Sequence, residues 1–152
     1  MTPSQSAQIA PISSQERRHW NRLYAAWVIS LVSSLSVLFV GEVLGQPPCT
    51  LCWYQRAMMF PLTVIMAIAC YRAATGIWIY ALPLAVIGWL FALYHSLLFA
   101  GAIPEPIKVC GAASCTDGTS NTLGGIPMPY MSLLAFSAIT GLLYPFRMRL
   151  PK

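Results

Sequence analysis

The chain has 152 residues, of which 57% are hydrophobic and only 9% are charged. Ordinary soluble domains carry about 25% charged residues, so this composition excludes a globular domain covered by water-compatible side chains. The formal net charge is +5, but the basic residues flank apolar runs, as they do in membrane proteins. We therefore expect the lipid bilayer as the environment of the chain, and no nucleic-acid partner.

Four apolar runs are long enough to cross a membrane, because about 20 helical residues span about 30 Å of hydrocarbon. The expected helices lie at about residues 23–44, 53–71, 77–100 and 128–146. The first run could instead be a cleavable signal peptide, but it exceeds the usual apolar core of about 7–15 residues. The sequence thus predicts an all-α membrane protein, a four-helix transmembrane bundle over residues 23–146, with tails at residues 1–22 and 147–152.

Charge asymmetry predicts how this bundle is oriented. The basic residues on the side of the two termini are Arg17, Arg18, Arg22, Arg72, Arg147, Arg149 and Lys152. The other side carries Glu42, Glu105 and Asp117 together with Lys108 and Arg56. Because positive charge accumulates on the cytoplasmic side of membrane proteins, we expect both tails in the cytoplasm and the two loops that carry cysteine pairs outside it.

The first cysteine pair, Cys49 and Cys52, follows two prolines and is expected in the first turn of the second helix. A helix N-terminus favours a thiolate, and the Cys-X-X-Cys spacing permits a small, readily opened disulfide. A purely structural disulfide is disfavoured, because so short a loop removes little chain entropy. The fifth cysteine, Cys70, lies about 27 Å along the same helix and is expected to be a small apolar packing residue.

Two other polar residues in the apolar runs are candidates for binding a ligand. Arg56 follows Cys52 by four residues and shares its helix face, where it can hold polar ligand oxygens or simply extend to the interface. His95 lies level with the outer end of the second helix and is either near the same site or an interfacial, hydrogen-bonded histidine.

The second pair, Cys110 and Cys115, lies among small residues of the second outer loop. Disulfides in exposed, tight rings are the exchange-competent kind, although a structural clip that orders the loop is the alternative. Two labile pairs on one side of the membrane indicate a relay of disulfide exchange.

The motifs resemble those of the disulfide bond formation protein B (DsbB) family, especially its short BdbC-like members. The string from Pro48 to Arg56, the pair of cysteines at 110 and 115, and the Gly-Ile-Pro-Met-Pro start of the fourth helix carry the resemblance. It implies a protein-dithiol:quinone oxidoreductase of the bacterial cytoplasmic (inner) membrane. Its partners would be a soluble thioredoxin-fold thiol oxidase (DsbA-like) and the membrane quinone pool, with ubiquinone or menaquinone as electron acceptor and no metal.

The resemblance also assigns roles to residues. Cys49 and Cys52 match the pair near the quinone, Arg56 matches the arginine beside it, and His95 corresponds to a family histidine by position only. Cys110 and Cys115 match the pair that meets the partner, and the resemblance implies that Cys110 forms the mixed disulfide. Local charge, with Lys108 near Cys110 and Asp117 near Cys115, would instead favour attack at Cys115. Longer family members separate this second pair widely, so the short gap here is a departure from the pattern.

Two alternative functions are weighed against this one. A vitamin K epoxide reductase-like enzyme would also combine helices, a Cys-X-X-Cys motif and a quinone, but the Pro-Pro-Cys and Trp-Tyr-Gln-Arg segments argue against it. A non-enzymatic structural or metal-binding protein, with four cysteines around zinc, fits poorly with a pair that opens a transmembrane helix in an oxidising compartment.

Overall fold

The structure is a computed structural model, and it describes residues 14–45, 48–72, 75–102, 122–123 and 126–147. Its main elements are α1 (Ser14–Leu38), α2 (Thr50–Arg72), α3 (Trp78–Phe99) and α4 (Met128–Arg147). A π-helical turn, η1 (Phe39–Val43), extends α1, and a 3-10 turn, η2 (Thr75–Ile77), precedes α3. Within these ranges, four helices are long and apolar enough to cross a membrane, which confirms the predicted fold class.

Two details differ from the expected elements. Helix α1 begins at Ser14, ahead of the expected start at residue 23. Glu16 lies in its first turn, where the helix dipole stabilises a carboxylate. His19 packs on Phe146 of α4, with the ring centroids 5.2 Å apart. A short antiparallel pair, β1 (Thr122–Leu123) and β2 (Ile126–Pro127), leads into α4.

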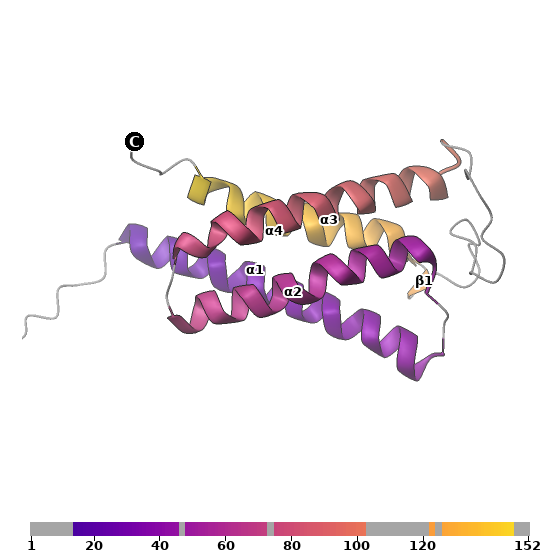
Figure 1. The fold of residues 1–152 in the computed structure, drawn as a ribbon, viewed down its shortest axis with the longest axis horizontal. Helices are drawn as coiled ribbons and strands as arrows, with labels where there is room; N and C mark the ends of the chain where they lie inside the picture. Colours follow the sequence, from indigo (N-terminus) through magenta and orange to yellow (C-terminus); the bar gives the residue numbers. More distant parts are fainter. Residues whose placement is uncertain (1–13, 46–47, 73–74, 103–121, 124–125, 148–152) are drawn as a thin grey trace, which may run out of the picture.

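The helices form a bundle in which α1 packs against α2 and α4, and α3 packs against the same two helices. Helix α1 begins and α4 ends at the same end of the bundle (Figure 1). The first turn of α2 and the last turns of α3 lie at the opposite end, beside β1 (Figure 1). This arrangement brings the two segments that carry Cys49 and His95 together.

Small and hydroxyl-bearing residues mediate close helix contacts, as is usual where helices pack in a bilayer. Ser34 of α1 and Thr63 of α2 lie within hydrogen-bonding distance, with their oxygens 3.0 Å apart. Between α3 and α4, the ring of Phe136 packs directly on Gly88. A Cβ added at Gly88 would lie 2.2 Å from that ring. The largest fully buried side chains include Leu62, Met66, Phe136, Ile139 and Leu143.

We expect Gly88→Ala to destabilise the bundle, because the added methyl group collides with the Phe136 ring. Overpacking of this kind typically costs about 1–3 kcal/mol, which should lower the melting temperature of the detergent-solubilised protein. Gly141→Ala is the matched control on α4, since a Cβ there meets nothing within 4 Å. Equal melting temperatures for the two variants would contradict the close packing of α3 on α4.

Candidate active site

The first cysteine pair lies at the N-terminus of α2, with Cys49 immediately before the helix and Cys52 in its first turn. The Cys49 carbonyl accepts a hydrogen bond from the Trp53 N–H at 3.2 Å. The Cys49 sulfur accepts another from the Cys52 N–H at 3.3 Å. Cys49 therefore occupies the capping position, where a side-chain acceptor satisfies an otherwise unpaired helix N–H.

The two cysteines face different surroundings although their sulfur atoms are only 2.7 Å apart. Cys49 is completely buried and packs with Leu98 of α3. Cys52 is half-buried and lines a cavity. A disulfide can form between them without movement of the helix, and Cys52 is the member that a ligand in the cavity can reach.

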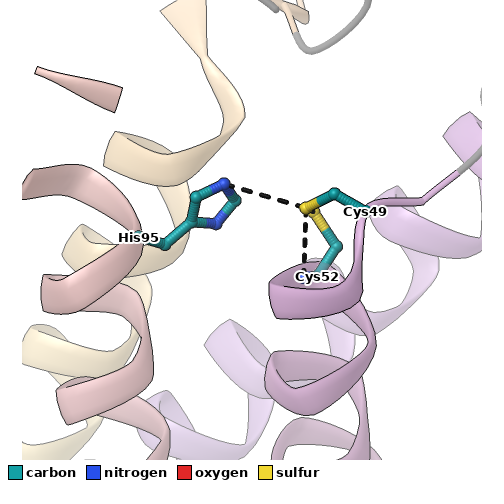
Figure 2. A group of neighbouring side chains, drawn as sticks. All are labelled: Cys49, Cys52 and His95. Atoms are coloured by element: carbon teal, nitrogen blue, oxygen red, sulfur yellow. Dashed lines mark hydrogen bonds between the residues drawn. The ribbon is translucent and has the colours of Figure 1, made fainter. Parts of the chain in front are cut away.

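His95 of α3 points toward the cysteine pair (Figure 2). Its Nε2 atom lies 3.8 Å from the Cys49 sulfur, and its side chain is only 1% exposed. Its other ring nitrogen, Nδ1, lies 3.2 Å from the side-chain nitrogen of Gln55. The structure thus brings His95 to the pair, as one of its two sequence-based interpretations expected, but on the side of Cys49.

Gln55 is a site residue that the sequence analysis missed. It is buried in α2, and it follows Cys52 by three residues, which places both on one helix face. An uncharged amide is common in helices, so the residue type alone does not indicate a site. The available signal was its position within an apolar span, where a buried polar group needs a hydrogen-bonding partner.

Arg56 connects α2 to the end of α1. Its guanidinium donates a hydrogen bond from Nη2 to the carbonyl of Val37 at 3.0 Å and lies 5.6 Å from the centre of the Trp53 ring. It also fits against Gly41 of the π-helical turn, where a Cβ would come within 3.2 Å of Nη2. A guanidinium has five N–H donors, more than one carbonyl can accept, so it retains capacity for ligand oxygens.

A cavity of about 190 Å³ lies beside Cys52, between the C-terminal half of α1 and the N-terminal half of α4. Its walls are mostly apolar, and Arg56, Gln55 and His95 contribute polar groups. Sequence reasoning did not find the walls from α1 and α4, because their residues are ordinary components of apolar spans. These walls consist of Val32, Ser33, Ser36, Val37 and Val40, and of Met128, Met131, Ser132, Ala135 and Phe136.

The surroundings of Cys49 favour the protonated form of its thiol. The hydrogen bond with Cys52 and, next, burial raise the pKa of the Cys49 thiol to about 12, although the neighbouring His95 acts to lower it. The lowering expected at a helix N-terminus is therefore outweighed at Cys49. When the pair is reduced, Cys49 retains its proton at neutral pH.

The remaining sequence-based candidates lie elsewhere. Cys70 is half-buried near the far end of α2 and packs against the main core. Cys110 and Cys115 lie outside the described residues, so their role as a second redox pair stays a prediction.

Comparison with known proteins defines the family. The family model "Disulfide bond formation protein DsbB" matches residues 17–145. A "Probable disulfide formation protein" of Metapseudomonas resinovorans is 53% identical over 132 residues, covering 86% of this chain and 92% of the relative. A "Probable disulfide formation protein C 2" of Bacillus anthracis is 40% identical over 120 residues, which cover 78% of this chain and 85% of the relative. No solved structure matches this chain significantly.

The chain belongs to the DsbB family of membrane disulfide-forming oxidoreductases, and the resemblance seen in its motifs is confirmed.

We expect the alkylation rate of Cys49 in the reduced protein to keep rising about tenfold per pH unit up to pH ~10, because only the thiolate reacts and the pKa lies near 12. Iodoacetamide labelling followed by peptide mass spectrometry measures this profile for each cysteine. Cys52→Ala removes the main cause of the shift and should bring the plateau to lower pH, whereas Cys70→Ala should not. A plateau near pH ~9 in the unmodified chain would contradict the assignment.

Proposed function

We propose that this protein is a membrane thiol oxidase that reoxidises a soluble, thioredoxin-fold disulfide donor and passes the electrons to a membrane quinone. It would thereby support disulfide bond formation outside the cytoplasm. One observation carries the proposal: Cys52 of the Cys-X-X-Cys pair and Arg56 line the same, mostly apolar cavity. Family membership supports the same conclusion and argues against the vitamin K epoxide reductase-like and structural alternatives.

The cavity suits a quinone as the second substrate. Ligand sites of this kind are mostly apolar, with a few placed polar groups that fix orientation. A quinone offers an apolar ring and tail, and two carbonyl oxygens that need hydrogen-bond donors. Arg56 would supply donors to one of these oxygens, since it lines the cavity and its guanidinium is held by the Val37 carbonyl. Ubiquinone and menaquinone share this chemistry, and either would fit the proposal.

The proposed reaction begins at the second pair. A thiolate of the partner attacks Cys110 in the Cys110–Cys115 disulfide, and Cys115 leaves as a thiolate. Cys115 then attacks Cys49, which breaks the Cys49–Cys52 bond and leaves Cys52 as the thiolate beside Arg56. The second thiol of the partner then closes the partner's own disulfide and frees Cys110, which re-forms the Cys110–Cys115 bond and releases Cys49. The Cys49 and Cys52 thiols re-form their disulfide as two electrons and two protons pass to the quinone, which leaves as quinol.

The environment of the first pair supports this division of roles. A thiol with a raised pKa leaves slowly in disulfide exchange, and the pKa of the Cys49 thiol is raised, so attack at Cys52 with Cys49 as the leaving group is disfavoured. Attack at Cys49 instead expels Cys52, which lines the cavity. His95, 3.8 Å from the Cys49 sulfur, is in position to give or take the proton that Cys49 exchanges during the cycle.

We also propose that the cysteine-bearing end of the bundle faces the periplasmic, or outer, side of a bacterial cytoplasmic membrane. Arg17, Arg18, Arg22 and Arg72 lie toward the opposite end, which the positive-inside rule assigns to the cytoplasm. Both termini would then be cytoplasmic.

Quinone reduction by the purified protein, supplied with a reduced thioredoxin-fold oxidase, tests the function. We expect Arg56→Met to raise the apparent KM for quinone about 10- to 100-fold, the effect of losing a charge-assisted hydrogen bond. Disulfide exchange with the partner, followed separately by trapping the mixed disulfide, should stay nearly unchanged. Arg72→Met is the matched control, because Arg72 lies exposed at the other end of α2. No reduction with either quinone type would refute the proposal.

Orientation is tested by labelling intact cells with a membrane-impermeant thiol reagent after reduction. We expect Cys110 and Cys115 to be labelled from outside, because the charge asymmetry places their loop there. Labelling that requires permeabilisation of the membrane would reverse the orientation.

A further inference from the structure

Three potential metal ligands meet at the outer ends of α2 and α3. The sulfur atoms of Cys49 and Cys52 and a ring nitrogen of His95 all lie within 4.8 Å of one another. Cys49 and His95 are almost completely buried, and Cys52 lines the cavity. In the oxidised pair the sulfurs are bonded to each other and are poor ligands, but reduction gives two thiols that become thiolate donors when a metal displaces their protons.

The spacing fits a tetrahedral cation of the zinc type. Zinc binds thiolate sulfur at about 2.3 Å and imidazole nitrogen at about 2.0–2.1 Å, so neighbouring ligand atoms in a tetrahedron lie roughly 3.5–3.8 Å apart. The distance of 3.8 Å between the Cys49 sulfur and the His95 Nε2 atom meets this requirement. The sulfurs, now 2.7 Å apart, need to separate by about 1 Å. The half-buried Cys52 side chain can make this movement toward the cavity.

Gln55 completes the arrangement from behind. A metal-bound histidine usually donates its second ring N–H to a polar neighbour, which fixes the tautomer that presents a lone pair to the metal. Gln55 lies 3.2 Å from His95 Nδ1, and its amide, turned to place its oxygen there, accepts that N–H. Nε2 then carries its lone pair toward the sulfurs. The cavity beside Cys52 leaves room for water as a fourth ligand.

We propose that Cys49, Cys52 and His95, with the pair reduced, form a three-ligand site for a thiophilic divalent cation such as Zn²⁺. Binding transfers no electrons: two thiols release their protons to solvent, and two metal–sulfur bonds form. The bound cation holds both sulfurs that must otherwise form the disulfide. The consequence for activity rests on the proposed function: the bound cation should block reoxidation of the pair and act as a reversible inhibitor.

Binding is measured on full-length protein carrying Cys70→Ala, Cys110→Ala and Cys115→Ala, purified without a histidine tag, so that only the first pair remains. After reduction under anaerobic conditions, titration with Cd²⁺ should give one equivalent of thiolate-to-metal charge-transfer absorption, and the oxidised protein should give none. X-ray absorption of the Zn²⁺ form should show two sulfur neighbours and at least one nitrogen neighbour.

Variants separate this site from simple chelation by two neighbouring thiols. Gln55→Leu should weaken binding about 10- to 100-fold, the usual effect of removing an outer-shell partner, and His95→Ala at least as much. His19→Ala is the matched control, since His19 packs on Phe146 at the other end of the bundle, and should not change the affinity. Absent binding, or unchanged affinity in both site variants, would overturn the three-ligand site.

The functional consequence is measured separately on the chain with all five cysteines. Zn²⁺ added to the reduced protein should slow quinone reduction, and a chelator should restore the rate. Unimpaired quinone reduction at saturating Zn²⁺ would overturn the inhibitory role. Failure of quinone reduction without any metal would refute the proposed function instead, and Cd²⁺ binding would still decide the metal site.

Discussion

A chain of buried polar contacts at the end of the bundle where α2 begins determines how the cysteine pair is presented. Within a bilayer, polar side chains need protein partners, because lipid offers none. Gln55 of α2 contacts the His95 ring on one side, and the Cys49 sulfur lies on the other side of the same ring. These contacts hold the first turn of α2 against α3. As a result Cys49 is buried. Cys52 lies three residues further along the chain and lines the cavity.

A second polar contact ties the same end of α2 to α1. The Arg56 guanidinium binds the Val37 carbonyl and lies close to Gly41, at the point where α1 changes to a π-helical turn. Such turns occur often at functional sites. The cavity thus has a charged group on one side and the apolar residues of α4 on the other. One end of α2 therefore separates two chemically unlike sulfurs, a protonated Cys49 and a cavity-facing Cys52.

The sequence predicted what depends on local composition and missed what depends on packing. Length and hydropathy were sufficient to predict four spanning helices. The four-residue spacing between Cys52 and Arg56 predicted that the first pair and the Arg56 guanidinium share one helix face. The start of α1 at Ser14 was missed, because it relies on contacts such as that of His19 with Phe146. Gln55 and the α1 and α4 walls were missed for the same reason, since only tertiary structure shows which residues of an apolar span face a cavity. The high pKa of Cys49 likewise follows from burial and from Cys52.

Photo-crosslinking with a quinone probe tests the central claim most directly, namely that the cavity beside Cys52 and Arg56 is where the quinone binds. We expect azido derivatives of ubiquinone or menaquinone to label peptides from residues 32–40 and 128–136, which form the cavity walls from α1, η1 and α4. Excess unlabelled quinone should abolish this labelling. Specific labelling confined to the exposed side of α2, around Val64 and Ile68, would contradict it.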